Sequence, residues 1–180
     1  MKNKKKKYSI DLRVIYDAII ISILIIADRV LKVYAVKKLK DHPNKPVING
    51  ILELNYLENT GAAFGLLRGQ RIFFILVGTI IICAIIWLVF KMPRKKKYVA
   101  AHIALSLIFA GAVGNMTDRI IYEYVIDYIY FSFIRFPVFN LADAYVTVAT
   151  IMLIILLLFV YKEDDLNFLR FKEKRLREIE

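Results

Sequence analysis

The sequence predicts an all-α polytopic membrane protein, and three observations lead to this fold class. Hydrophobic residues make up 59% of the chain, whereas about 45–50% is usual in soluble domains. The mean hydropathy is positive. Three segments, 72–90, 98–116 and 144–161, contain no Asp, Glu, Lys or Arg, and each approaches the roughly 20 apolar residues that a membrane-spanning helix needs.

A fourth span is expected at residues 14–34, on the condition that Asp17, Asp28 and Arg29 are tolerated there. The alternative for this segment is a secretory signal peptide. It has no cleavage site of small residues and continues into charged sequence, which argues against that alternative. We therefore expect four transmembrane helices.

Lys and Arg residues indicate the orientation, because they are enriched in cytoplasmic segments. Residues 1–13 carry six, the short connection 91–97 carries five, and residues 162–180 carry six. The longer connections, 35–71 and 117–142, carry six and two. Both termini are thus expected in the cytoplasm. The net charge of +11 then reflects topology and attraction to anionic lipids, and we expect no nucleic-acid partner. This divides the chain into a basic N-terminus, a membrane domain at 14–161 and a charged tail.

The first outer connection is expected to contain a short β element. Residues 51–59, "ILELNYLEN", partly alternate between apolar and polar residues, and Pro46 and Gly50 precede them. Other chemistry has little support in the sequence. His42, His102 and Cys83 do not form a metal-binding pattern, so no metal or cofactor is expected.

Asp127 and Asp143 require an explanation, because each lies beside a long apolar run where a carboxylate is costly. Two carboxylates close together at low dielectric cannot both ionise easily, so one keeps its proton. An aspartic protease uses such a pair. Alternatively, Asp127 is an exposed loop residue or pairs with Arg119 or Arg135. Asn140 is a good helix N-cap that would place Asp143 in the first turn, and capping alone is the competing interpretation of "FNLAD".

Further polar and small residues are expected at the same outer face. In "GNMTDR", Asp118 and Arg119 suggest a structural hydrogen-bonding unit at a helix C-terminus. In "NTGAAFG", the small residues Gly61 and Ala62 would let a ligand backbone approach, unless they serve only turn or helix packing. Asp28 is either a functional residue or part of an inward structural pair.

Five motifs of this chain resemble, in order and spacing, those of bacterial lipoprotein signal peptidase (signal peptidase II). They are "ADRVLK", "ENTGAAFG", "GNMTDR", "VIDYI" and "FPVFNLAD". The resemblance covers about residues 14–161. It implies four transmembrane helices, a small extracytoplasmic β-cradle and a short helical flap. It also implies a cofactor-free intramembrane aspartic endopeptidase that cuts diacylglyceryl-prolipoproteins at the outer face of the bacterial cytoplasmic membrane, where globomycin would inhibit it.

The resemblance also implies roles for individual residues. The catalytic pair falls on Asp127 and Asp143, with Asp118 as the second candidate for the first position. The supporting or substrate-binding set consists of Asp28, Asn59, Gly61, Ala62, Asn115, Asp118, Arg119 and Asn140. We expect a monomer that contacts membrane lipids.

The competing class is a small four-span transporter or assembly factor with inward carboxylates. A transporter should carry such residues near the membrane midplane, whereas here they gather at one end of the spans. A presenilin-type protease is disfavoured, because its Gly-x-Gly-Asp signature is absent from the sequence.

Overall fold

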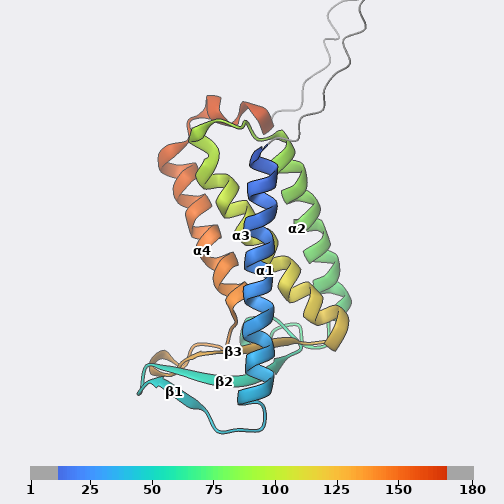
Figure 1. Ribbon diagram of the computed structural model, residues 1–180, viewed down its shortest axis with the longest axis vertical. Coiled ribbons are helices and arrows are strands. Elements are labelled where there is room, and N and C mark those ends of the chain that lie inside the picture. Colours follow the sequence, from blue (N-terminus) through green and yellow to red (C-terminus); the bar gives the residue numbers. More distant parts are fainter. Residues whose placement is uncertain (1–11, 170–180) are drawn as a thin grey trace, which may run out of the picture.

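The computed structural model describes residues 12–169, which form a helical bundle with a small sheet at one end (Figure 1). The central helix, α3, packs against each of the other three long helices. The long helices are α1 (Leu12–Leu39), α2 (Arg71–Lys91), α3 (Val99–Tyr122) and α4 (Leu141–Ile155), and α4 continues as a π-helical turn over Leu156–Val160.

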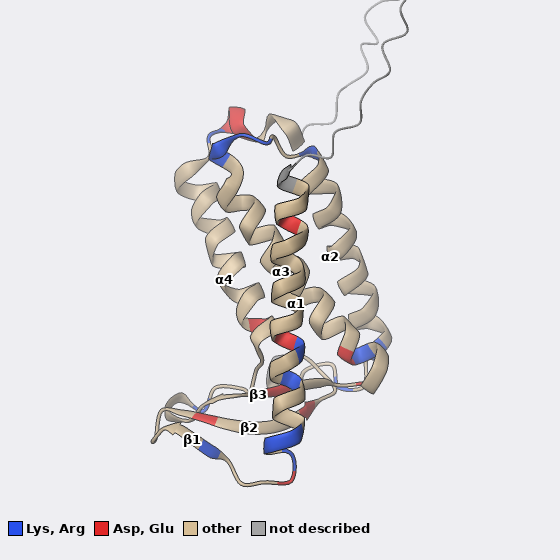
Figure 2. Cartoon of the chain, in the orientation of Figure 1, with Lys and Arg blue, Asp and Glu red and all other residues tan. Residues whose placement is uncertain are grey.

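Within the described chain, three helical segments are long and apolar enough to cross a membrane: Arg71–Lys91, Lys96–Tyr122 and Leu141–Val160. These contain the three uncharged segments of the sequence, so the chain is a multi-pass membrane protein. Helix α1 is longer than any of them but carries charges within its apolar stretch (Figure 2). Helix α3 extends beyond the predicted end at residue 116, so "GNMTDR" lies inside its last turns.

Small residues allow other elements to approach α3 closely. A Cβ atom on Gly111 would lie 2.5 Å from the carbonyl oxygen of Ala142 at the start of α4. A Cβ atom on Gly114 would lie 2.5 Å from Oδ2 of Asp28 on α1. Both distances are too short for carbon, so only glycine fits at these two positions. Close contact through small residues is a common way of packing helices in membranes.

The sheet is antiparallel with the order β1-β2-β3. Its strands are β1 (Lys45–Ile48), β2 (Leu52–Asn59) and β3 (Val125–Phe131). Strand β2 corresponds to the β element expected at residues 51–59, whereas β1 precedes that segment. Strand β3 was not expected from the sequence, although its β-branched and aromatic residues suit a strand. A 3-10 turn, η1 (Ala63–Gly65), follows β2.

A hairpin returns the chain from β3 to α4. Ile129 and Phe139 form an antiparallel bridge, with hydrogen bonds of 2.8 and 2.9 Å in the two directions. The aromatic segment between them is therefore a closed loop, and residues 127 and 140 are brought to the same place. Phe131, Phe136 and Phe139 pack ring against ring inside this loop.

Both described ends of the chain lie at the end of the bundle opposite the sheet, as does the connection between α2 and α3 (Figure 1). The tail begins there with a 3-10 helix, η5 (Glu163–Leu169). Asp165 of this helix forms an ion pair with Lys97 from the connection between α2 and α3. Most of the basic N-terminus and the second half of the charged tail lie outside the described residues.

Candidate active site

The start of α4 is fixed by a capping box. The side-chain oxygen of Asn140 accepts a hydrogen bond from the backbone N–H of Asp143 at 3.0 Å. In return, Oδ2 of Asp143 accepts from the backbone N–H of Asn140 at 3.1 Å. The predicted N-cap is therefore present. It also holds the Asp143 carboxylate over the first turn, where the helix dipole favours negative charge.

Asp127 lies on β3 and is almost completely buried. Its Oδ2 accepts a hydrogen bond from Nδ2 of Asn59 at 2.8 Å, and its Oδ1 accepts from Nδ2 of Asn140 at 2.6 Å. Asn59 ends β2, and the residue pairs Leu57↔Asp127 and Asn59↔Val125 set its position beside β3. Asp127 is thus neither an exposed loop residue nor the partner of Arg119 or Arg135.

Asn140 contacts both carboxylates, and Asn115 on α3 completes the connection. Nδ2 of Asn115 donates to Oδ1 of Asp143 at 2.7 Å, while its Oδ1 accepts from Nδ2 of Asn140 at 3.1 Å. Each of the four carboxylate oxygens of Asp127 and Asp143 therefore accepts a hydrogen bond. The two acids, sixteen positions apart in the sequence, belong to one hydrogen-bond network.

The environment of Asp127 favours its protonated form. Burial first, and then the nearby negative charge of Asp143, raise its pKa to about 7, although hydrogen bonds from the amides of Asn59 and Asn140 lower it. A carboxyl group that titrates near neutral pH can give up and take back a proton during a reaction. Because the two carboxyl groups interact, the titration belongs to the pair.

A cluster of four charged residues supports the site from α1 and α3; Asp28, Lys32 and Asp118 are buried, and Arg29 is partly exposed. Nζ of the fully buried Lys32 lies 3.0 Å from Oδ2 of Asp28 and 2.8 Å from Oδ2 of Asp118. Arg29 donates two hydrogen bonds to Oδ1 of Asp118, each 2.9 Å long. Lys32 also donates to Oδ1 of Asn115 at 2.9 Å, so this cluster determines how the Asn115 amide is oriented.

Lys32 was not among the site residues expected from the sequence. Its position four residues after Asp28 in "ADRVLK" places both side chains on the same face of a helix, which was the available signal. Asp28 also accepts a hydrogen bond from the backbone N–H of Ala142 at 3.1 Å. It therefore ties α1 to the first turn of α4, next to Asp143.

Asp118 and Arg119 do not form the unit that their adjacency suggested. Asp118 faces Arg29 and Lys32, and it accepts from the backbone N–H of Ile126 at 3.3 Å. Arg119 points the other way and donates to the carbonyl oxygen of Gly61 at 3.0 Å. Adjacent residues on a helix lie on different faces, which explains the separation.

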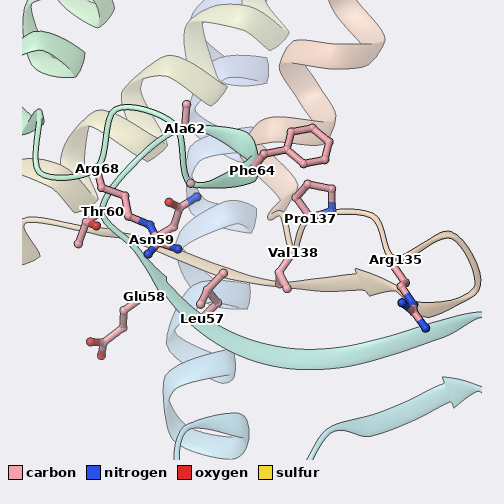
Figure 3. A pocket seen from close by; sticks show the side chains of 11 residues that line it. Leu57, Glu58, Asn59, Thr60, Ala62, Phe64, Arg68, Arg135, Pro137 and Val138 are labelled. Carbon is pink, nitrogen blue, oxygen red and sulfur yellow. The ribbon is translucent and has the colours of Figure 1, made fainter.

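In the turn after β2, the backbone of Leu66 packs directly against Gly61 and leaves no room for a side chain there. A Cβ atom there would lie 2.5 Å from the carbonyl oxygen of Leu66, and the Gly61 N–H donates to Oδ1 of Asn59 at 2.9 Å. Gly61 therefore allows the turn to close and holds Asn59 toward Asp127. Ala62 lines a cavity of about 490 Å³ next to Asn59 (Figure 3).

This arrangement is suited to proton transfer. It offers a buried carboxyl group, that of Asp127, a half-buried one, that of Asp143, and several fixed amide donors beside an open cavity. Within residues 12–169, no three His, Cys, Asp or Glu side chains are placed to hold a metal ion. The chemistry that these residues themselves can perform is activation of a water molecule by a carboxylate pair.

Comparison with known proteins gives a consistent result. The family model described as "Signal peptidase (SPase) II" matches residues 20–159. A lipoprotein signal peptidase of Clostridium tetani is 41% identical over 151 residues, covering 82% of this chain and 94% of that protein. One of Lactobacillus johnsonii is 39% identical over 147 residues, covering 81% and 94%.

Solved structures agree with the sequence relatives. A bacterial membrane enzyme determined at 1.9 Å resolution superimposes with a TM-score of 0.70 at 32% identity, covering 81% of this chain and 94% of the other. A second, at 2.3 Å, gives a TM-score of 0.69 at 33% identity, covering 79% and 87%. The chain therefore belongs to the signal peptidase II family of peptidases.

Proposed function

We propose that this protein is an intramembrane aspartic endopeptidase that removes the signal peptide from diacylglyceryl-modified prolipoproteins, cutting before the lipidated cysteine. Asp127 and Asp143 form the catalytic pair. The observation that carries this assignment is Asn140, which hydrogen-bonds both carboxylates and thereby holds them in one site. Asp118 is not assigned a catalytic role, because Arg29 and Lys32 already neutralise it.

We place the shared proton of the pair on Asp127 at the start of the reaction and the negative charge on Asp143, and the raised pKa of Asp127 supports this choice. Asp143 takes a proton from a water molecule, whose oxygen attacks the scissile carbonyl carbon. Asp127 gives its proton to the carbonyl oxygen, which forms a gem-diol. Asp143 then protonates the departing nitrogen of the cysteine, Asp127 recovers a proton from the gem-diol, and the C–N bond breaks.

The neighbouring residues position these groups. Asn59, Asn115 and Asn140 orient the carboxylates, while Asp28 and Lys32 fix the start of α4 and the Asn115 amide. Arg119 holds the turn that contains Gly61 and Ala62 against the site. We assign the flap to this turn, residues 60–69, and expect globomycin to compete with the substrate beneath it.

We further propose that α1 is a fourth span, that both termini are cytoplasmic and that the sheet and active site face outward. The charges of α1 at Asp28, Arg29 and Lys32 are neutralised within the bundle, which lowers their cost in a membrane. A substrate at this level must be membrane-anchored. A diacylglyceryl group supplies the anchor at about 0.8 kcal/mol per buried methylene.

The decisive experiment incubates the purified protein with a prolipoprotein in lipidated and unlipidated forms and measures cleavage by gel shift. We expect cleavage of the lipidated form alone, inhibited by globomycin. Asp127→Asn and Asp143→Asn should each abolish cleavage, and the double variant should be no worse than either, because the acids act as a unit. Near-normal activity of either single variant would contradict the catalytic pair. Absence of cleavage by the unmodified protein would favour the transporter or assembly factor.

A further inference from the structure

The cavity next to the proposed active site is lined by positively charged side chains that have no role in the proposed chemistry. Its volume is about 490 Å³, within the range usual for ligand sites. It is formed by the end of β2, the turn at residues 60–69 and the loop at residues 135–138, and none of the four long helices contributes to its lining. The cavity therefore opens on the sheet side of the carboxylate pair and not between the helices.

Two arginines line this cavity, one near each end. Arg68 lies beside Asn59, whose amide bonds the Asp127 carboxylate, and Arg135 lies at the opposite end (Figure 3). Gly65 leaves room for the first of them: a Cβ atom there would lie 2.9 Å from Nε of Arg68. The backbone of Arg135 has a left-handed conformation, with φ of 50°.

Neither guanidinium has an acidic partner within residues 12–169. The other arginines around the site are engaged, Arg29 by Asp118 and Arg119 by the carbonyl oxygen of Gly61. The one acid in the cavity lining, Glu58, is already bound by Lys40 at 2.9 Å, which lowers the pKa of Glu58. The cavity thus offers two free cations of the type that binds carboxylates in a bidentate manner.

We propose that Arg68 and Arg135 select substrates with acidic side chains in the first residues after the lipidated cysteine. The inference rests on the proposed function. The signal peptide and the diacylglyceryl group are apolar and remain with the helices, whereas the mature segment must leave the membrane past the sheet. In the proposed orientation the sheet faces outward, so the cavity formed by β2 and the two loops lies on the side to which the mature segment leaves, and Asn59 connects it to Asp127. An anionic phospholipid headgroup fits less well, because the two cations lie at opposite ends of a cavity bounded by the sheet and its loops.

The test compares two lipidated prolipoproteins that differ only after the cysteine, one with Asp at the second and fourth positions and one with Asn there. For the unmodified protein we expect kcat/KM to be several-fold higher with the acidic substrate, mainly through KM. The ratio of kcat/KM for the acidic substrate to kcat/KM for the neutral substrate should fall toward one at high salt, because exposed charge pairs are screened.

Arg68→Gln combined with Arg135→Gln should bring the ratio of acidic to neutral kcat/KM close to one. Arg68→Glu should favour a substrate with Lys at the same positions. Lys45→Gln, an exposed cation on β1 outside the cavity lining, is the matched control and should keep the ratio.

An unchanged ratio in the double variant, or no preference in the unmodified protein, would overturn the inference. The inference would also be overturned if the double variant lost the same share of kcat/KM with both substrates and the loss varied with the anionic lipid content of the vesicles that hold the protein. That result would point to a lipid headgroup as the ligand of the two arginines. Cleavage of neither substrate by the unmodified protein would instead contradict the proposed function itself. Equal cleavage of both would contradict only the selection.

Discussion

At the scale of single residues, the protonation of Asp127 connects structure with pH dependence. Its pKa of about 7 arises first from burial and then from the charge of Asp143. In the proposed mechanism the pair holds one proton, so raising the pH above about 7 removes the acid that protonates the carbonyl oxygen. We expect kcat/KM to fall about tenfold per pH unit above this value, as for any essential acid. A profile measured from pH 5 to 9 that stayed flat above 7 would contradict the assignment.

The same raised pKa predicts a change in stability. Between the pKa of the unfolded chain, near 3.8, and the folded value of about 7, the folded protein holds a proton that the unfolded chain has lost. The free energy of unfolding therefore decreases as pH rises through this window, by up to roughly 1.4 kcal/mol per unit from this group. Thermal unfolding of Asp127→Asn should show a correspondingly weaker pH dependence. An identical dependence in both proteins would mean that Asp127 is not buried as described.

Lys32 provides a prediction about stability that does not depend on catalysis. Lys32→Met leaves Asp28 close to Asp118 without the cation between them. Removing one member of a buried ionic group costs about 3–5 kcal/mol, and each kcal/mol lowers Tm by roughly 2–4 °C at this chain length. We expect a Tm about 10 °C lower, partly restored by adding Asp28→Asn.

A matched control is available at the surface. Lys40 pairs with Glu58 at 2.9 Å, but both side chains are exposed. Exposed pairs contribute little to stability, so Lys40→Met should leave Tm almost unchanged. Equal effects of the two methionine variants would contradict the buried cluster.

At the scale of the elements, two glycines allow α3 to organise the site. Gly114→Ala would place a methyl group 2.5 Å from the Asp28 carboxylate, which holds the start of α4 through Ala142. We expect lower activity, and we expect the free energy of unfolding to decrease by about 1–3 kcal/mol, as for other overpacked positions. Gly78→Ala on α2 is the control, because its Cβ would meet only Met116 Sδ at 3.6 Å. The comparison uses cleavage rates and Tm of both variants, and equal behaviour would argue against the close approach.

The sequence predicted some elements of this structure and missed others for physical reasons. The apolar spans and the Asn140 cap were predictable, because length, composition and local capping chemistry determine them. Strand β3 was not, since "VIDYIYF" becomes a strand by pairing with β2, more than sixty residues earlier. The partner of Asp118 was also hidden, because Arg29 and Lys32 come from a different helix.

At the scale of the whole molecule, the proposed active site lies where three separate parts of the chain meet. The sheet contributes Asn59 and Asp127, the start of α4 contributes Asn140 and Asp143, and α3 contributes Asn115 between them. The carboxylate pair therefore exists only when the sheet is docked on the bundle. Anything that moves the sheet relative to α4 changes the distance between the two acids and hence the activity.

The orientation of the molecule gives the last prediction. If α1 crosses the membrane with α2, α3 and α4, the chain begins in the cytoplasm; if α1 does not cross, it begins outside. Green fluorescent protein fused before Met1 should then be fluorescent, since it does not mature when exported through the general secretion pathway. In a Cys83→Ser background, Val47→Cys on β1 should react with a membrane-impermeant maleimide on intact spheroplasts. Lys95→Cys, in the connection at the opposite end of the bundle, should react only after lysis. A dark fusion together with an accessible Val47→Cys would reduce the number of spans to three and leave α1 on the outer face.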